Sequence, residues 1–307
     1  MRIKNIFRPL KVKFGSDRRY IKNRYKKIFG FEPNLDNPTR FSEIINWIKI
    51  NNRNNLHSTC SDKLAVRDFV KKAVNADILI PLLAHGARWV DLNYSSLKEP
   101  FIIKTNHGSG QVRIIYDKRQ ENETDIRKDF ESQLKENYYY GLREWQYKNI
   151  KPKILVEKLL QAENGLIPDD YKFHCFNNNG AIELVLELIS GRLSNTRGDF
   201  YTESWDRLPF ELSYPKSEVA TEKPANFPEL CAIARQLSKN FQYVRVDLYT
   251  IGNKIYFGEL TFTPTSGVTR FQPDDWDFIF GKKILDTGII KNSMGKLVSD
   301  SLRSSIK

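Results

Sequence analysis

Alternating apolar and polar positions between residues 243 and 267 predict two adjacent β-strands joined by a Gly252-Asn253 turn. The first strand directs Arg245 and Asp247 to one face and its apolar side chains to the other. In the second strand, the alternation places Glu259 on the same face as Ile255, Phe257 and Thr261. Each strand therefore projects one carboxylate.

The length of the turn decides which of these side chains meet. A two-residue loop would place Asp247 opposite Gly258 and send the two acids to opposite faces. A three-residue loop would pair Asp247 with Glu259 and Arg245 with Thr261. We expect the three-residue loop because it gathers a guanidinium, two acids and a hydroxyl into a patch suited to Mg²⁺ and phosphate. Taken alone, the stretch fits equally well an ordinary hairpin with a cross-strand salt bridge.

Two helices are predicted near the start of the chain. The first lies in FSEIINWIKI, residues 41–50, where Ser42 can act as N-cap and the apolar positions indicate burial. The second begins near Ser61-Asp62, and its apolar positions recur every four residues. Its other side carries a basic stripe, which is usually a solvated face but could supply a cation to phosphates: Lys63, Arg67 and Lys71.

Short buried strands are predicted at residues 78–82 and 101–104. The second strand delivers Lys104 into a small-residue turn, and the strand QVRIIY follows. This order indicates a hairpin lid and not the strand-to-helix turn of a P-loop. Backbone amides of such a turn can approach phosphate oxygens. The turn contains His107, Gly108, Ser109 and Gly110.

The second half of the chain is predicted to begin with a polar helix at residues 123–140. The strand KILVEKLL follows, and Glu157 interrupts its apolar run. In the next strand, DDYKFHCF, alternation places Asp170, Lys172 and His174 on one face. A lone histidine in a strand is more often a satisfied structural residue than a base, and we assign His174 no catalytic role.

The strand AIELVLELI then leads into a loop that holds Arg192 and Arg197. A helix at residues 228–240, primed by a proline, packs an apolar side and delivers the chain into the paired strands described first. No Ser/His/Asp or Cys/His arrangement emerges from the motifs.

At 307 residues, 40% hydrophobic and 28% charged, the chain can bury a sizeable core in one large or two modest domains. Its three cysteines lack CxxC spacing, so neither a zinc site nor a disulfide framework is indicated, and reduced thiols in the cytoplasm are expected. No apolar run reaches about 18 residues, so no membrane span is predicted. A secretory signal is not expected because no uninterrupted apolar stretch follows the first charges.

The net charge of +12 is concentrated at the start of the chain, where residues 1–30 hold eleven Lys/Arg and one acid. Apolar and aromatic residues are interleaved with these charges. The favoured interpretation is a solvated basic helix whose apolar side packs on the next domain. Peripheral contact with the anionic inner face of the cell membrane is the alternative. We expect no nucleic acid partner.

The order of these separate signals resembles the ATP-grasp superfamily. More closely, the chain from about residue 30 to residue 285 is similar to TupA-like ATP-grasp proteins of polysaccharide biosynthesis loci. The combined set is specific, although no single motif is decisive. The resemblance rests on these stretches: NPTRFSEIINWIKI, SDKLAVRDFV, FIIKTNHGSG, DDYKFHCF, YVRVDLY, IYFGELTFTP and FQPDDWD.

The resemblance implies a nucleotide-binding role for many of these residues. Lys63 and Lys104 would contact the phosphates of ATP, and the turn from His107 to Gly110 would fold over them. Glu157 would lie at the adenine amino group, and the backbone of Leu159 and Leu160 would read the ring edge. Two further residues would approach the ribose and the phosphates, respectively: Asp170 and Lys172.

The resemblance also implies that Asp247 and Glu259 bind Mg²⁺ and that Arg245 steadies the transferring phosphoryl group. Thr261 occupies a position where the superfamily usually has an amide or acid ligand. A hydroxyl is the weaker Mg²⁺ ligand, so this part of the metal site is expected to be loose. Arg192 and Arg197 are the candidates for holding the acceptor carboxylate.

The implied activity is ATP- and Mg²⁺-dependent ligation of a carboxylate to an amine through an acylphosphate. The family association suggests an amino acid or other amine joined to a uronic acid of a bacterial capsular or O-antigen polysaccharide, or of its precursor. Three alternatives remain: a glycosyltransferase, a sugar phosphotransferase, and a non-catalytic polyanion-binding protein. A glycosyltransferase would need a DxD-type pair, whereas the two acids lie on separate strands.

The implied fold class is α/β (α+β). The resemblance implies an ATP-grasp fold in which two α+β subdomains clasp the nucleotide, and a helical N-terminal region precedes them in the chain. The predicted divisions are a basic segment at residues 1–30, a helical region at 31–100, a lid at 101–155, and a C-terminal subdomain with the metal site at 156–307.

Overall fold

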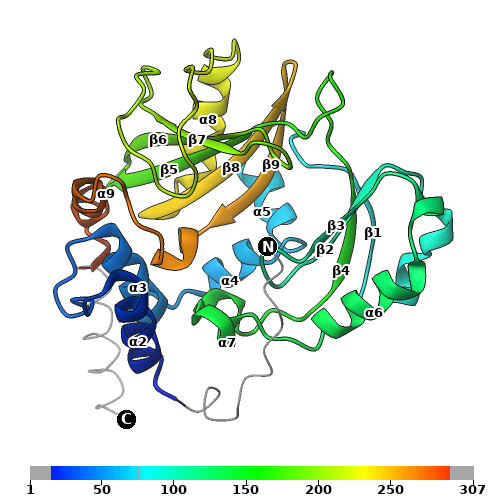
Figure 1. Cartoon of the computed structure of the whole chain (residues 1–307), viewed down its shortest axis with the longest axis horizontal. Helices are drawn as coiled ribbons and strands as arrows, with labels where there is room; N and C mark the ends of the chain where they lie inside the picture. Colours follow the sequence, from blue (N-terminus) through cyan, green and yellow to red (C-terminus); the bar gives the residue numbers. More distant parts are fainter. Residues whose placement is uncertain (1–14, 75–76, 291–307) are drawn as a thin grey trace.

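The computed structural model of the chain describes residues 15–74 and 77–290 (Figure 1). Two sheets dominate, a four-stranded sheet in the order β1-β4-β2-β3 and a five-stranded sheet in the order β7-β6-β5-β8-β9. All neighbouring strands within them are antiparallel. Helices and sheets together confirm the predicted α+β class.

The elements follow the chain from the N-terminal helices to α9. The strands are β1 Leu82–Gly86, β2 Phe101–Thr105, β3 Val112–Ile115, β4 Ile154–Lys158, β5 Asp170–Asn178, β6 Ala181–Ser190, β7 Arg197–Tyr201, β8 Tyr243–Ile251 and β9 Lys254–Thr261. The α-helices are α2 Asp17–Phe29, α3 Phe41–Asn51, α4 Asn55–Ser61, α5 Val66–Ala73, α6 Glu123–Gln133, α7 Tyr139–Leu142, α8 Phe227–Ser238 and α9 Asp275–Asp286. The 3₁₀ helices are η1 Trp89–Leu92, η2 Tyr94–Ser96, η3 Lys118–Gln120, η4 Trp145–Tyr147 and η5 Pro264–Gly267.

The two faces of the five-stranded sheet are covered differently. On one face, α5 and α8 complete a continuous apolar core that includes Val66, Leu230 and Val246. On the other face, α3 and α9 contribute to an aromatic cluster around Phe41 and Phe280. The charged side chains of β5, β6 and β8 alternate onto this second face, beyond the aromatic cluster. The second face therefore holds both a core and a group of charges.

Helix α3 begins differently from the prediction, because its N-cap residue is Arg40 and not Ser42. The carboxylate of Glu43 accepts the backbone N–H groups of Thr39 and Arg40 at 3.1 and 3.3 Å, which satisfies the first turn. Ser42 is buried instead, and its hydroxyl donates to Asp277 Oδ2 at 2.7 Å. The serine thus ties α3 to α9.

The structure has two helices around Ser61-Asp62, where one was predicted: α4 ends at Ser61, and the predicted helix is α5, which begins only at Val66. Asp62 interrupts them because its Oδ1 accepts the backbone N–H of Leu64 at 2.8 Å and forms a local turn. The predicted polar helix at residues 123–140 is likewise two, α6 and α7.

The strand predicted at residues 78–82 is wrong in its bounds, because β1 starts only at Leu82. Leu79 instead forms a parallel bridge to Phe257 beside β9, and Phe257 N–H donates to Ile78 O at 2.7 Å. The four-stranded sheet therefore takes its strands from residues 82–158 and the five-stranded sheet from residues 170–261. The predicted lid at 101–155 and the other domain divisions stay predictions.

A β-bulge at Gly258 decides the register of β8 and β9. Asp247 pairs with Glu259, as predicted, but Leu248 pairs with Phe257, so that one residue of β9 is left over. The turn itself has two residues, because Ile251 pairs with Lys254. The expected three-residue loop is wrong, and the bulge produces the expected pairing in its place.

The bulge also corrects the predicted faces of β9. Ile255 and Phe257 lie in the apolar core, whereas Glu259 and Thr261 lie on the charged face. A Cβ atom at Gly258 would lie 3.0 Å from both Asp247 O and a ring carbon of Tyr249. Glycine at this position therefore permits the close approach of the two strands.

We expect Gly258→Ala to lower the free energy of unfolding by about 1–3 kcal/mol, because the added methyl group overpacks against backbone atoms. Urea denaturation followed by circular dichroism measures this change. Gly252→Asn is the control, because no atom lies within 4 Å of a Cβ at that turn glycine and asparagine tolerates its φ of +55°. Equal stability of the alanine variant and wild type would contradict the role of the bulge.

Candidate functional site

An ion-paired cluster begins on β8 with Arg245 and Asp247. Arg245 Nε lies 2.7 Å from Asp247 Oδ1, and Arg245 Nη2 lies 2.7 Å from Asp247 Oδ2. This is the two-pronged geometry in which a guanidinium binds a carboxylate most strongly. Both residues are buried, with Asp247 only 1% exposed. The pair therefore forms a rigid, desolvated centre.

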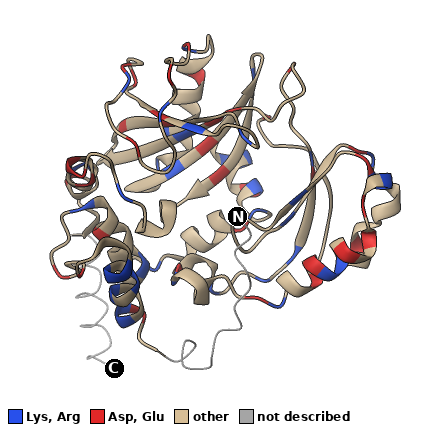
Figure 2. Cartoon of the chain, in the orientation of Figure 1, with Lys and Arg blue, Asp and Glu red and all other residues tan. Residues whose placement is uncertain are grey.

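Two more cations extend the cluster across β5. Lys172 Nζ lies 2.5 Å from Asp247 Oδ2 and 3.7 Å from Asp170 Oδ2. Arg192 Nε donates to Asp170 Oδ2 at 2.7 Å. Charges of opposite sign therefore alternate along this face, and Figure 2 shows basic and acidic segments on the neighbouring strands of the sheet. Lys172 thus contacts Asp247 directly, and Asp170 is connected to Asp247 through Lys172.

Glu259 and Thr261 on β9 complete the predicted metal patch. Thr261 Oγ1 donates to Glu259 Oε1 at 3.0 Å, and Arg245 Nη2 lies 3.3 Å from Thr261 Oγ1 and 3.5 Å from Glu259 Oε1. The Glu259 side chain is 38% exposed, whereas that of Asp247 is 2% exposed. Of the two acids, Glu259 is therefore the one that is open to an incoming ligand.

Sequence reasoning missed Glu187 on β6. Its Oε2 lies 3.9 Å from Arg245 Nη1 and 3.5 Å from His174 Nε2, and His174 Nδ1 is 2.8 Å from the hydroxyl of Tyr243. His174 is fully buried, and its Nε2 has no hydrogen-bond partner among the described residues, so it is not fully satisfied as expected. Its structural role stays a prediction. The signal for Glu187 was available, because this acid interrupts the apolar run AIELVLELI just as Glu157 interrupts its own strand.

The neighbouring charges decide the ionisation of Asp247. Burial by itself would raise its pKa, but the charges of Arg245 and Lys172 and their hydrogen bonds outweigh burial and lower that pKa below its usual value. Burial likewise opposes the charge of Arg245, and Asp247 raises the pKa of Arg245 above its usual value. Asp247 is therefore a carboxylate whose two oxygens already have cationic partners.

On the four-stranded sheet, Lys104 and Arg67 share the carboxylate of Glu157. Lys104 Nζ lies 2.6 Å from Glu157 Oε2, and Arg67 Nη1 lies 3.1 Å from Glu157 Oε1. The Glu157 side chain is 7% exposed. In this structure Glu157 holds two cations of the basic stripe and the hairpin, and its predicted contact with adenine stays a prediction.

Lys63 brings the two sheets together. Its Nζ donates to Gly108 O in the hairpin turn, and its backbone N–H donates to Asn106 O at 3.2 Å. Burial lowers the pKa of Lys63, and among the nearby charges that of Glu259 opposes this shift most. A lysine held by the turn of the small sheet therefore lies within electrostatic reach of an acid on the large one.

The remaining predicted nucleotide contacts lie at both ends of the small sheet. His107 Nε2 is 3.2 Å from Glu136 O, and Ser109 and Gly110 are exposed at the tip of the hairpin. Beyond β4, Leu159 donates its backbone N–H to Pro100 O at 3.3 Å, and both Leu159 and the next residue, Leu160, are buried. The structure describes where these residues lie, and their roles stay predictions.

Arg197 is not brought to the cluster. It opens β7 and does not lie in a loop as expected, and it pairs with Ser190. Ser190 lies on the same face of β6 as Leu186 and Leu188, which belong to the apolar core. Glu187 points to the opposite, charged face. Arg197 Nη1 lies 3.5 Å from Lys216 O. Of the two predicted acceptor arginines, only Arg192 adjoins the cluster.

The donor set fits a Mg²⁺ ion that is shared with a nucleotide. Among the described residues there is no group of three or more His, Cys, Asp or Glu side chains that could hold a metal. Magnesium is usually bound by one or two carboxylates together with substrate phosphates, and not by an all-protein cage. Glu259, which is open, meets that smaller requirement, whereas both oxygens of Asp247 are already held by Arg245 and Lys172.

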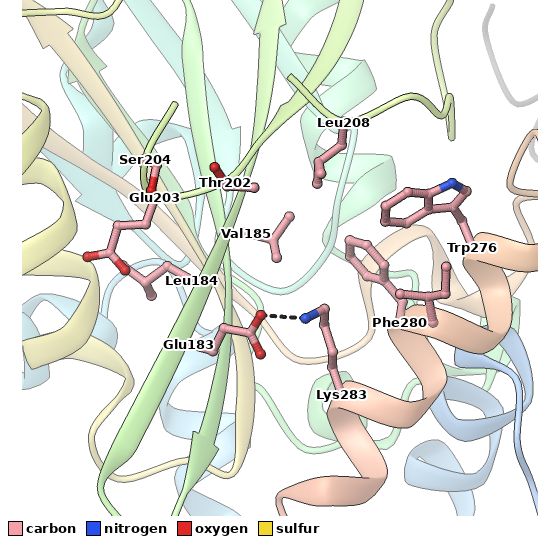
Figure 3. A pocket seen from close by; sticks show the side chains of 11 residues that line it. Glu183, Leu184, Val185, Thr202, Glu203, Ser204, Leu208, Trp276, Phe280 and Lys283 are labelled. Carbon is pink, nitrogen blue, oxygen red and sulfur yellow. Dashed lines mark hydrogen bonds and ion pairs between the residues drawn. The ribbon is translucent and has the colours of Figure 1, made fainter. Parts of the chain in front are cut away.

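A pocket on the same sheet face lies apart from the cluster, where β6 and the residues after β7 meet α9 (Figure 3). Val185, Trp276 and Phe280 line it, and Lys283 pairs with Glu183 there. Its lining includes none of the predicted site residues within the part of the chain that the structure describes. The ion-paired cluster is therefore the candidate site.

Comparison with known proteins gives one family. The model of the family described as TupA-like ATPgrasp matches residues 43–285 of the chain. No curated protein matches this chain. In the helices that the structure describes, none is both long and apolar enough to cross a bilayer.

Three ligases are among the similar solved structures. D-alanine–D-alanine ligase from Helicobacter pylori has a TM-score of 0.43 and 16% identity, covering 74% of this chain and 60% of that one. The Bacillus anthracis enzyme complexed with ATP has a TM-score of 0.42 and 19% identity, covering 77% and 65%. Phosphoribosylamine–glycine ligase from Thermotoga maritima has a TM-score of 0.42 and 12% identity, covering 69% and 50%. The chain thus spans 60% of the length of the first of these ligases.

We expect Glu157→Gln to destabilise the protein by roughly 3 kcal/mol, because removing a buried carboxylate leaves two cations without their counter-ion. Denaturant unfolding measures the change. Glu163→Gln, at an exposed acid for which no partner is found among the described residues, is the matched control. Equal losses in the two variants would refute the pairing of Glu157 with Lys104 and Arg67.

Proposed function

Because this chain belongs to the TupA-like ATP-grasp family, we propose that it is an ATP- and Mg²⁺-dependent ligase that joins a carboxylate to an amine through an acylphosphate. One observation carries the proposal. Lys63, anchored to the hairpin turn at Gly108, lies within electrostatic reach of Glu259, which adjoins the Arg245–Asp247 pair. Cations and acids from separate sheets thus surround one place where a metal–triphosphate complex would carry the complementary charges.

In this proposal the chain acts by positioning and by charge. Lys63 and Lys104 hold the phosphates under the turn, with Lys104 directed by Glu157, and Arg245 faces the transferring phosphoryl group. Glu259 and Asp247 would hold Mg²⁺, which would supply charge neutralisation for the phosphates. Thr261 keeps Glu259 in place through their hydrogen bond. None of these roles requires a protein nucleophile.

The reaction proceeds in two displacements. An oxygen of the substrate carboxylate attacks the γ-phosphorus, the bond to the β-phosphate oxygen breaks, and ADP leaves. The amine nitrogen then attacks the acyl carbon, phosphate departs with the bonding electron pair, and the nitrogen loses a proton. Asp170 and Lys172, which adjoin Asp247, are assigned to the ribose and the phosphates. Glu157, Leu159 and Leu160 are assigned to the adenine end.

The substrates are proposed from the family association. The carboxylate belongs to a uronic acid of a surface or capsular polysaccharide or its precursor, and the amine is an amino acid or another amine. The enzyme acts at the cytoplasmic side of a bacterial membrane, which residues 1–30 contact peripherally. Ile21, Tyr25 and Phe29 of α2 are buried within the protein, so this contact is electrostatic.

ADP release with Mg-ATP, measured against a panel of uronic acids and amines, tests the ligase. We expect Asp247→Asn and Glu259→Gln to lower turnover at least about 100-fold, because each removes a carboxylate assigned to Mg²⁺. Glu229→Gln, an exposed acid on α8, is the control and should match wild type. Turnover of the two site variants at the wild-type rate would sink the assignment.

Co-sedimentation with phosphatidylglycerol vesicles tests the membrane contact. Residues 1–14 carry five Lys/Arg and no acid. We expect their deletion to weaken vesicle binding at least about tenfold, because each basic residue near an anionic surface contributes about 1 kcal/mol. Vesicles of phosphatidylcholine are the neutral control. Undiminished binding of the shortened chain would exclude a role for this segment.

A further inference from the structure

Helix α2 is tied to the segment that contains α7 and η4. The hydroxyl of Tyr20 donates to Gly141 O at 2.9 Å, and that of Tyr139 donates to Asp17 Oδ1 at 2.6 Å. Lys49 of α3 reaches the same segment, with Nζ 3.2 Å from Leu142 O. In Figure 1, α2 and α3 lie together and α7 is near them. The basic helix α2 is therefore packed against the rest of the protein.

The same segment adjoins the candidate site. Gln146 Nε2 donates to Thr263 Oγ1 at 2.7 Å, and Thr263 in turn donates to the buried carboxylate of Glu144. A Cβ atom at Gly108 would lie 3.0 Å from the ring of Tyr138. The segment thus touches both the strand end after Glu259 and the hairpin turn, and connects them to α2.

On the same helix, the side chain of Arg24 has no partner among the described residues. It lies one turn beyond Tyr20, so the two side chains share a helix face. Its Nε is buried, and no hydrogen bond or ion pair engages the side chain within residues 15–74 and 77–290. A buried donor without an acceptor costs about 1–3 kcal/mol. Arg192 and Arg197, by contrast, already have acceptors.

The charge of Arg24 acts on three groups around this space. After burial, which is the main cause, it helps to lower the pKa of Lys49. It also opposes the raised pKa values of Tyr138 and Glu144, which burial again causes first. Glu259 acts on Tyr138 and Glu144 as well. Glu144 and Tyr138 therefore lie within reach both of Arg24 and of the acid assigned to the metal.

We propose that Arg24 binds the carboxylate of the amine substrate, which makes that substrate an amino acid. This inference rests on the proposed ligase function and names one of its two substrates. A guanidinium with free donors recognises a carboxylate in two-pronged fashion. The bound carboxylate is not the reacting one, because the charge of Arg24 acts on Tyr138, Glu144 and Lys49, none of which belongs to the Arg245–Asp247 pair.

Binding of paired probes tests the assignment directly. L-alanine, L-serine and L-glutamate, each beside its α-amide, are titrated calorimetrically into the full chain with Mg-ADP present. We expect the wild type to bind at least one acid about tenfold or more tightly than its amide, which lacks the negative charge. Arg24→Gln should lose this preference, and Arg24→Lys, which keeps the charge without the planar fork, should retain part of it.

Lys72→Gln on α5 removes an exposed charge away from this segment and should behave as wild type. Thermal unfolding establishes that each variant is folded. If Arg24→Gln does not fold, Arg24→Lys still tests the proposal. The proposal is overturned if no acid is preferred over its amide by wild type, or if the Arg24 variants keep the full preference.

Turnover separates this inference from the ligase proposal. Failure of wild type to release ADP with any uronic acid and amine would count against the ligase, whatever the probes bind. An acid preference that depends on Arg24 would still establish the carboxylate site. With turnover present, we expect Arg24→Gln to raise the KM for the amino acid at least about tenfold and to leave the KM for ATP unchanged.

Discussion

The bulge at Gly258 is the constraint on which the candidate site depends. Side chains of a strand alternate between the faces of a sheet, so an unbroken β9 would put Phe257 and Glu259 on the same side. The left-over residue separates them, which buries Phe257 in the apolar core and turns Glu259 toward Arg245. A carboxylate and a core residue can therefore lie two positions apart in one strand.

The carboxylates buried in the two sheets are ion-paired. Asp247 has both of its oxygens on cations, and Glu157 holds two cations on the other sheet. Burial disfavours each ionised group, and the opposite charges offset that penalty. Glu259 is the exception, since its side chain is 38% exposed. The cluster is thus closed on the sheet side and open at the acid nearest Lys63.

The basic start of the chain serves the interior as well as the surface. Figure 2 shows basic residues gathered on α2, and several of them face outward. Yet Tyr25 and Ile21 are buried, as expected of a helix whose apolar side packs on the rest of the protein. Arg24 lies one turn beyond Tyr20, whose hydroxyl donates to Gly141 O, and its Nε is buried. One cation of this basic helix is thus drawn into the interior.

Sequence alone determined the features that depend on local alternation. It predicted the hairpin at Lys104 and the shared face of Asp170 and Lys172, because a strand's side-chain period of two needs no knowledge of distant residues. The α+β class followed from the family that the combined motifs resemble. Sequence also predicted the pairing of Asp247 with Glu259, although through a three-residue loop that does not exist.

Tertiary structure decided what depends on contacts between distant segments. The sharing of Glu157 by Arg67 and Lys104 and the place of Glu187 beside Arg245 each join residues far apart in the chain. Such contacts form because a buried charge is stable only beside its counter-charge, and which counter-charge is in reach depends on how the sheets and helices pack. Alternation shows which way a side chain points, and packing decides what it meets.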